Sequence, residues 1–475
     1  MNTGSLRTES VARSIFEKKL QFPPGFLDSL NEIKGFNRES FVRVHDSGEP
    51  VTSIRLNPFK PVASLSFGLG DPPNPVPWCA MGFYLPERPS FTLDPLFHAG
   101  CYYVQEASSM FLEAVIKQAM PRHADNPYKV LDLCGAPGGK STHLSALFPK
   151  GFIVANEVNK LRAAILTENA IKWGRENLAV ANNDPGDFNA LQGYFDAILV
   201  DAPCSGSGLF RKDEDAIAEW SLNNVRQCSI RQRKILEDIW PSLKEDGFLI
   251  YSTCSYSAEE DEDILDWMLD KFDAETCRIS VGHNLGIVEL QTTRNGAWAY
   301  RFFPDLIKGE GFFISCISKK SGGQISKIGA KKSEKPTRQE LDILQNWVSL
   351  GDEFECCKLN GEIHIVPREW LDQAIALSSR LYFKKLGVYP GKLIGSELVP
   401  DHQLALSSLV SNKIPAMELS LQEALQYLRK ESLPSNSMHH GWMLVKYKGI
   451  NIGWAKALAN RTNNYYPKDW RILKS

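Results

Sequence analysis

Short apolar runs recur at a regular pace in the middle of the chain. They are YKVLDL (128–133), GFIVANE (151–157), NLAVANND (177–184), FDAILVD (195–201) and GFLIYST (247–253). Helical patterns such as KSTHLSALF and NVRQCSIRQRKILEDIWPSL separate them. Unbroken runs rich in Val, Ile, Leu and Phe are typical of strands that are buried on both faces. The pattern predicts an α/β fold with a Rossmann-like, doubly wound parallel sheet, whose loops at the carboxyl ends of the strands carry the chemistry.

The flanking regions have different patterns. Before the central region, FLDSLNEIKGF has a helical pattern, SFVRVHDSGEPVTSIRLNPFK a β-rich one, and LGDPPNPVPWCAMGFYLPERPSF too many prolines for a helix or a central strand. After it, helices are expected near RQELDILQNWVSL and PREWLDQAIALSSRLYFKKL. The predicted division is an N-terminal α/β module with its Pro-rich connection (1–100), a catalytic domain (101–318), a lysine-rich linker (319–338), a helical or mixed domain (339–430) and a small β-barrel (431–475).

The composition limits the class of protein. A chain of 475 residues with 43% hydrophobic and 23% charged residues is expected to form several globular domains. It contains no apolar run near the roughly 20 residues that span a bilayer, so we expect a cytoplasmic protein without a membrane segment. Its ten cysteines have no regular spacing and are expected to be free thiols. The net charge of −2 does not indicate a nucleic-acid partner by itself.

The stretch DLCGAPGGKST (132–142) resembles a phosphate-binding loop but does not have the residue spacing that such a loop requires. A Walker A loop needs Gly at position 134, where this chain has Cys. The dinucleotide fingerprint fails too, because Gly135, Gly138 and Gly139 have the wrong spacing. FDAILVD imitates a Walker B strand, so a P-loop ATPase remains an alternative. A strand, a tight turn and a helix N-terminus nevertheless predict backbone N–H groups that point at a polar ligand.

Two acidic residues further along the chain indicate the class of that ligand. Glu157 ends the second apolar run, where a carboxylate can accept hydrogen bonds from ribose hydroxyls, and Asp184 ends the third, where it can meet an exocyclic amine of adenine. Together with the loop they predict a nucleoside ligand. S-Adenosylmethionine fits, because its carboxylate and ammonium need a backbone-lined turn rather than a phosphate cradle.

Two cysteines follow the fourth and fifth apolar runs, in DAPCSGSG and YSTCSYS. Asp201, Cys204 and Cys254 are therefore expected at neighbouring strand ends, on the same edge as the cofactor loop. No metal site is expected, because no Cys-x-x-Cys or His cluster accompanies them. A thiolate beside a methyl donor indicates covalent catalysis on a pyrimidine, because addition at C6 makes C5 nucleophilic. The remaining cysteines outside the loop are expected to be small buried hydrophobes: Cys79, Cys101, Cys228, Cys277, Cys316, Cys356 and Cys357.

These motifs resemble those of the NOL/NOP/Sun family of RNA cytosine-5 methyltransferases. DLCGAPGGKST, DAPCSGSG and YSTCSYS match its signature blocks, and YYVQEASSM and GEGFFIS fit the same pattern. The resemblance implies that Cys254 is the nucleophile, that Cys204 assists release of the product and that Asp201 engages the cytosine N3 edge. It also implies the S-adenosylmethionine contacts Cys134, Gly135, Ala136, Pro137, Gly138, Gly139, Lys140, Glu157, Asp184 and Asp201. Gly135 replaces the usual Ala of this motif.

The flanks are similar to those of one bacterial group within this family. SIRLNPFK resembles an N-terminal RNA-binding module, and GWAKALANRTNNYYPKDWR resembles the PUA-like tail of the F group of 16S rRNA methyltransferases. The implied partner is 16S rRNA in the small ribosomal subunit, the implied target is a decoding-region cytosine, cytosine 1407, and the implied state is a monomer. Another rRNA or tRNA site, or an RNA chaperone without turnover, remains an alternative.

The tail has physical features of its own that favour RNA. Residues 441–475 contain seven Lys or Arg and one acidic residue. Six aromatic residues are interleaved with them: Trp442, Tyr447, Trp454, Tyr465, Tyr466 and Trp470. Cations bind phosphates and aromatic faces stack on unpaired bases. We expect about half of these aromatic side chains to form a core and the others to contact structured RNA.

Overall fold

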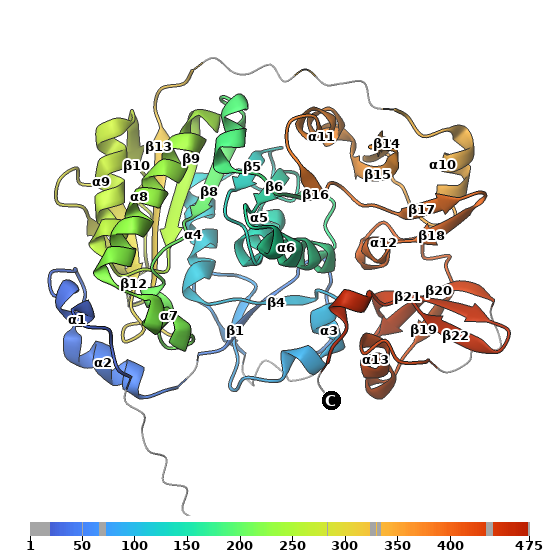
Figure 1. The fold of residues 1–475 in the computed structure, drawn as a ribbon, viewed down its shortest axis with the longest axis horizontal. Helices are drawn as coiled ribbons and strands as arrows, with labels where there is room; N and C mark the ends of the chain where they lie inside the picture. The colour runs from blue at the N-terminus through green and yellow to red at the C-terminus, as the bar shows by residue number, and fades with distance from the viewer. Residues whose placement is uncertain are drawn as a thin grey trace, which may run out of the picture.

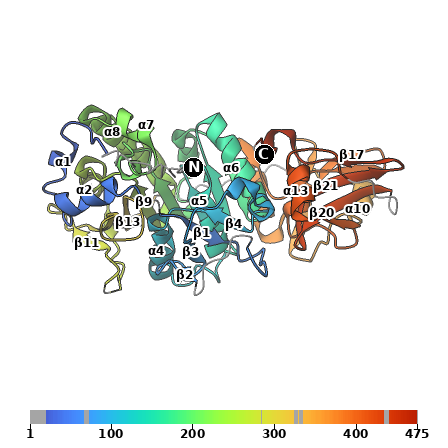
Figure 2. The ribbon, with the colours of Figure 1, turned by 90° about the horizontal axis from the view of Figure 1, so that it is seen from below.

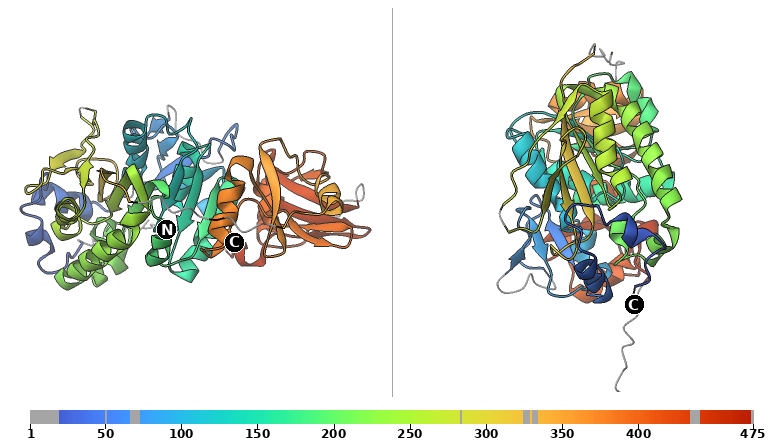
Figure 3. Two further views of the ribbon diagram at one scale, coloured as in Figure 1. Left: turned by 90° about the horizontal axis from the view of Figure 1, so that it is seen from above. Right: turned by 90° about the vertical axis from the view of Figure 1, so that its left-hand side faces the viewer.

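The computed structural model describes residues 20–49, 51–65, 73–282, 284–323, 329, 334–433 and 440–473. The molecule is elongated, with a large mixed sheet in one half and the C-terminal elements in the other (Figures 1 and 3). Helices α1 (Phe26–Ser29) and α2 (Arg38–Asp46) lie at one end, and the C-terminal sheet lies at the other (Figure 2).

The central sheet is the predicted doubly wound sheet with antiparallel additions. Its parallel core has the order β9-β8-β5-β6-β7. These strands are β5 (Lys129–Asp132), β6 (Phe152–Asn156), β7 (Leu178–Ala181), β8 (Phe195–Asp201) and β9 (Leu243–Thr253). On one side the sheet continues antiparallel through β13 (Phe312–Lys319), β12 (Trp298–Phe302) and β11 (Val288–Gln291), and β10 (Ala274–Thr276) also pairs with β13. All five predicted runs contain a strand of this core.

Helices cover both faces of the sheet because successive strand side chains point to opposite faces. Val130 packs in the cluster under α4 (Leu112–Ala119), α5 (Gly139–Leu147) and α6 (Lys160–Trp173). The next residue, Leu131, packs in the cluster under α8 (Leu222–Ile239) and α9 (Glu262–Lys271). The short helix α7 (Glu214–Glu219) follows the loop after β8. This double cover explains why the core strands are apolar without alternation.

The N-terminal module forms a small antiparallel sheet of order β2-β3-β1-β4. Its strands and helix are β1 (Ser53–Leu56), β2 (Asn74–Pro75), β3 (Gly82–Tyr84), α3 (Pro95–His98) and β4 (Tyr102–Val104). The β-rich prediction for the stretch that begins at Ser40 was wrong in its first part, which lies in α2. The Asn37 side chain caps this helix, and Phe41 and His45, four residues apart, form its buried face. Two buried residues four positions apart lie on one face of a helix, and their burial outweighs the alternation of valines that favoured a strand.

The region after the catalytic motifs contributes a strand to the central sheet. It contains α10 (Arg338–Leu344), β14 (Phe354–Leu359), β15 (Glu362–Pro367), α11 (Leu371–Ser378), β16 (Phe383–Lys385), β17 (Gly391–Ile394), β18 (Glu397–Pro400) and α12 (His402–Leu406). β16 pairs antiparallel with β7 at the edge of the central sheet. The predicted helix over PREWLDQAIALSSRLYFKKL is therefore wrong at its end. The buried Lys385 ammonium donates to the carbonyls of Arg175, Leu178 and Gly387, which holds this segment as an edge strand. Nine residues of the predicted lysine-rich linker, 324–328 and 330–333, lie outside the described residues.

The C-terminal region forms a second sheet of order β19-β20-β21-β22. Its elements are β19 (Ala416–Glu418), α13 (Leu421–Leu428), β20 (Gly441–Tyr447), β21 (Ile450–Leu458) and β22 (Arg461–Asn464). One face packs in a cluster with α13 and the N-terminal module, and the other packs against α12 and its neighbours. Among the described residues, no helix combines the length and the apolar character needed to cross a membrane.

Candidate active site

The glycine-rich turn lies between β5 and α5, where the sequence places it. Its backbone is tied to both neighbouring strands, because Leu133 N donates to Leu199 O and Gly135 N donates to Asn156 O. Gly138, just before α5, has a φ of 119°, a conformation that glycine adopts without a steric penalty. Residues of the turn line a cavity of about 350 Å³. Asp201, Cys254 and residues 103–106 of the N-terminal module line the same cavity.

An ion pair joins the turn to the end of β8. The Lys140 ammonium lies 2.8 Å from Asp201 Oδ2, and Ser252 Oγ donates to Asp201 Oδ1 at 2.7 Å. Burial disfavours the charged ammonium, but the Asp201 carboxylate outweighs it, so the pKa of Lys140 is raised. Lys140 therefore stays a cation in the cavity, and Asp201 is held in one orientation by two donors.

The two predicted cysteines meet at the ends of β8 and β9. Both are free and half-buried, and their Sγ atoms lie 3.1 Å apart. The hydrogen bond from the Cys204 thiol to Cys254, together with burial, raises the pKa of Cys204 well above its usual value. Cys204 therefore keeps its proton in this state, 3.1 Å from the sulfur of Cys254.

Glycines allow these two strand ends to approach closely. Gly208 N donates to Cys254 O at 2.7 Å, and a Cβ added at Gly208 would lie 2.7 Å from that oxygen. The oxygen belongs to the backbone of Cys254 itself, so it cannot move without displacing that residue. The CSGSG segment needs glycine at this position for a packing reason.

We expect Gly208→Ala to destabilise the fold by about 1–3 kcal/mol, the usual cost of overpacking, and to lower turnover. Urea unfolding and initial rates with saturating substrates would measure the two effects. Gly323→Ala is the matched control, because no atom lies within 4 Å of a Cβ added there. Equal stability and turnover of the two variants would show that the close contact at Gly208 is unimportant.

The structure adds Asp132, which the sequence analysis missed. It is fully buried at the end of β5, lines the cavity, and its Oδ1 has no hydrogen-bond partner, while Oδ2 accepts from Ser141 Oγ. Burial, opposed by Ser141 and reinforced by Asp201, raises the pKa of Asp132 to about 7. Its position immediately before the turn was the available signal, because the first strand of such sheets ends beside the ligand.

A second missed residue is Arg55, from β1 of the N-terminal module. Its buried guanidinium donates to Gly139 O at 3.1 Å and to Thr142 Oγ1 at 2.7 Å, at the start of α5. It also donates to Gln105 Oε1 and lies 4.6 Å from the ring centroid of Trp173. The N-terminal module thus stabilises the turn through hydrogen bonds to the first residues of α5. A contact across more than 80 residues leaves no periodic signal in the sequence.

Glu157 and Asp184 do not line the cavity that Cys254 and the turn line. Glu157, just after β6, is 3% exposed, accepts from Asn159 N and lies 3.3 Å from Arg162. Asp184 is exposed and caps the short turn that begins at Pro185. Glu157 follows β6, which is adjacent to β5, and Asp184 follows β7, the next strand toward β16. Their proposed ribose and adenine contacts stay predictions.

Most of the other cysteines are buried as expected. Cys79, Cys101, Cys228, Cys316 and Cys357 are buried, whereas Cys277 and Cys356 are only half-buried. The side chains of Cys79, Glu113 and His143 lie within 4.8 Å of one another. In this cluster the Lys117 ammonium forms an ion pair with the Glu113 carboxylate, and His143 Nε2 lies 3.1 Å from its other oxygen.

Half of the six tail aromatic residues belong to the core, as expected, whereas Trp442 and Trp470 are half-buried and Tyr465 is exposed. Tyr447, Trp454 and Tyr466 are buried. On the sheet, Trp442 pairs in register with Lys456, whose ammonium lies 5.3 Å from the Trp442 ring centroid. Tyr465, 39% exposed, lies 4.3 Å from the same ring. These three side chains combine an aromatic surface with a cation, the chemistry that binds unpaired bases and phosphates.

Three family models match successive parts of the chain. They are described as the N-terminal domain of 16S rRNA methyltransferase RsmF (residues 22–107), 16S rRNA methyltransferase RsmB/F (119–318) and the methyltransferase RsmF PUA domain (414–472). The catalytic match contains the turn and both cysteines, and the last match contains Lys456 and Tyr465.

Curated relatives match over nearly the whole length. Ribosomal RNA small subunit methyltransferase F of Psychromonas ingrahamii is 30% identical, covering 95% of this chain and 97% of the relative. The protein of the same name from Vibrio campbellii is 29% identical, covering 94% and 97%. In fold, the chain is similar to the crystal structures of PH0851 (24% identity, TM-score 0.53, 64% of this chain and 67% of that one) and of NSun6 from Pyrococcus horikoshii with SFG (20% identity, TM-score 0.51, 64% and 99%).

Proposed function

Because the chain belongs to the RsmB/F family of S-adenosylmethionine-dependent 16S ribosomal RNA methyltransferases, we propose that it makes 5-methylcytosine by covalent attack of Cys254 on the base. The observation that carries this proposal is the pair of sulfurs 3.1 Å apart beside a cavity lined by Asp201 and Lys140. A single nucleophile needs no second thiol, whereas addition followed by elimination gives each cysteine a step.

The residues around the turn fit the methionine end of S-adenosylmethionine. Asp132 offers an unpartnered carboxylate oxygen to an ammonium, and the start of α5 offers backbone N–H groups to a carboxylate. When bound, the cofactor supplies the methyl group. Cys134 to Lys140, with Asp132, would hold that end, and Glu157 and Asp184 would take the ribose and adenine.

The proposed attack begins with the base extruded into the cavity. The Cys254 thiolate forms a bond to C6 of the cytosine, and the electron pair of the C5–C6 double bond moves to C5, which takes the methyl group. Asp201 engages the N3 edge of the base, and the Lys140 ammonium, 2.8 Å from this carboxylate, holds it in its orientation. The low local dielectric strengthens both contacts.

Release requires a base, and we propose Cys204 for this step because its sulfur lies 3.1 Å from that of Cys254. The leading cause of its raised pKa is the hydrogen bond to Cys254. Once Cys254 is a thioether it carries no negative charge, so the pKa of Cys204 falls and its proton can leave to solvent. The Cys204 thiolate then takes the proton on C5, the C5–C6 double bond re-forms, and the Cys254 thiolate departs. The net exchange is a methyl cation gained and a proton lost by the base.

Cofactor affinity should depend on pH through Asp132. Its pKa in the free protein is about 7, and an ammonium beside it would lower that value. Binding then releases a proton at acidic pH, so affinity is full above pH 7 and falls as the pH drops below it, approaching about tenfold per unit. Calorimetry with S-adenosylhomocysteine measures this directly. The Asp132→Asn variant should bind S-adenosylhomocysteine more weakly, and its affinity should no longer depend on pH in this range. A wild-type affinity that does not change between acidic and neutral pH would contradict the role of Asp132 as the partner of the ammonium.

The proposed substrate is one cytosine in 16S rRNA of the small subunit, in the cytoplasm, with cytosine 1407 as the specific target. The RNA would be held by the N-terminal module and by Trp442, Lys456 and Tyr465 of the tail. A monomeric state stays a prediction. Bisulfite mapping of ribosomal and transfer RNA from cells with and without the gene tests the target. Loss of 5-methylcytosine at this position alone supports the proposed target. Loss at another rRNA or tRNA position would mean that the protein performs the same reaction on that site instead.

A further inference from the structure

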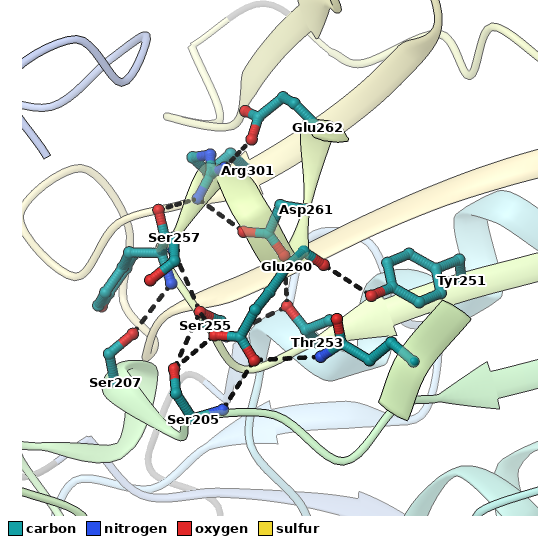
Figure 4. A network of polar contacts seen from close by, with 12 residues as sticks. Ser205, Ser207, Tyr251, Thr253, Ser255, Ser257, Glu260, Asp261, Glu262 and Arg301 are labelled. Atoms are coloured by element: carbon teal, nitrogen blue, oxygen red, sulfur yellow. Dashed lines mark hydrogen bonds and ion pairs between the residues drawn. The ribbon is translucent and has the colours of Figure 1, made fainter. Parts of the chain in front are cut away.

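A buried carboxylate lies between the two cysteine loops. Glu260, which is 0% exposed, follows β9 by seven residues and accepts four hydrogen bonds. They come from Ser205 N at 2.9 Å, Ser205 Oγ at 2.5 Å, Ser255 Oγ at 2.7 Å and Gln232 Nε2 at 3.1 Å. Ser205 is the residue after Cys204, and Ser255 is the residue after Cys254. Figure 4 shows both serines directed at this carboxylate from separate loops.

The carboxylate is itself held rigidly. Tyr251 OH donates to Glu260 O at 2.6 Å, and Ser257 N donates to Ser255 Oγ at 3.1 Å (Figure 4). The next residue, Asp261, accepts from Thr253 Oγ1 and forms an ion pair with the fully buried Arg301. Gln232 also donates to Pro203 O, beside Cys204. The network therefore fixes Glu260 against β9 on one side and against the loop after β8 on the other.

We propose that Glu260 is a positioning residue that sets the distance between the two sulfurs. One of its oxygens, Oε2, accepts both serine hydroxyls, so the two loops can move apart only by breaking one of these bonds. The sulfurs are each one residue away and lie 3.1 Å apart. This separation lets Cys204 donate to Cys254 before attack and reach the same base afterwards. The chemical roles of Cys204 and Cys254 rest on the proposed function, but the control of the distance between their sulfurs by Glu260 does not.

Glutamine at position 260 should break the arrangement without changing its size. Oε1 accepts from Ser205 N and Gln232, and Oε2 accepts from the two hydroxyls. An NH₂ group in place of Oε1 would face two N–H donors, and an NH₂ group in place of Oε2 would make both serine hydroxyls acceptors, so that their own protons lose the carboxylate. In either orientation the negative charge that strengthens these hydrogen bonds is lost. Ser255→Ala is a milder variant that removes one hydroxyl and keeps the carboxylate. Glu259→Gln is the matched control, because this neighbouring side chain is exposed.

The first readout measures the spacing without RNA or cofactor. Diamide oxidises two adjacent thiols to a disulfide, taking up two electrons and two protons, and peptide mass spectrometry quantifies the Cys204–Cys254 cross-link. We expect the rate to fall by about tenfold or more in Glu260→Gln and less in Ser255→Ala. Urea unfolding shows that each variant is folded. A folded Glu260→Gln protein that cross-links as fast as Glu259→Gln would overturn the proposal.

The second readout measures the consequence for catalysis. If the spacing serves release, Glu260→Gln should retain more protein as a covalent RNA adduct during turnover than Glu259→Gln does. A purely structural role would lower total activity without changing the adduct fraction. The wild-type protein could transfer no methyl group while Glu260→Gln still cross-links more slowly than Glu259→Gln. That result would reject the proposed function and leave the positioning role of Glu260 intact. An unchanged adduct fraction would limit Glu260 to a structural role.

Discussion

Cys254→Ala should abolish both methyl transfer and covalent attachment to RNA. Removing the nucleophile leaves C5 of the cytosine unactivated, because no thiolate can add at C6. Loss of a catalytic nucleophile costs about 10⁴–10⁶-fold in rate, so single-turnover assays with labelled cofactor and unmethylated 16S rRNA should give no product above background. The variant should still bind cofactor, because Asp132 and the turn are unchanged.

The control for this variant is Cys356→Ala, which removes a half-buried thiol on β14, outside the cavity lining. It should retain wild-type transfer. Normal turnover by Cys254→Ala, with intact protein and cofactor binding, would reject the covalent route.

Cys204→Ala should complete methyl transfer once and then stop. The methylated base stays attached to Cys254, because the alanine cannot take the proton on C5 and the elimination that frees the enzyme cannot occur. A denaturing gel should show protein shifted by bound RNA and carrying label from the cofactor. The amount of adduct should approach one per enzyme while multiple turnover falls by about 10²–10⁴-fold, the usual contribution of a general base.

The double variant Cys204→Ala, Cys254→Ala is the control, and it should form no adduct. If Cys204→Ala released free methylated RNA at the wild-type rate, another group would have to remove the C5 proton. Asp201 would then be the first residue to test, because it lines the same cavity.

The core of the fold could be predicted because its strands are buried on both faces. Such strands leave continuous apolar runs such as FDAILVD, and their carboxyl ends mark one edge of the sheet. That rule brought Asp201, Cys204 and Cys254 together correctly. Cys134, where Walker A requires Gly, already separated the turn from a phosphate loop, and family membership agrees.

The errors and omissions have a common physical origin. In α2 the valines suggested a strand, but Phe41 and His45 are buried together against residues remote in sequence. β16 was read as helix because its partner, β7, lies about 200 residues earlier. Arg55 and Glu260 act through tertiary contacts, and local pattern carries no information about those. Asp132 differs, because its place at the end of the first strand was a signal in the sequence. A buried carboxylate such as Glu260 looks in sequence like any acidic residue at the start of a helix.

The central claim is that Cys254 forms the bond to the base, and a substrate that cannot be released tests it most directly. RNA with 5-fluorocytosine at the target position has no removable proton at C5, so methyl transfer should leave a permanent adduct. Digestion and mass spectrometry then identify the attached residue. We expect one cross-link, on Cys254, that contains the transferred methyl group and requires the cofactor. Attachment through Cys204, or methylation without any adduct, would contradict it.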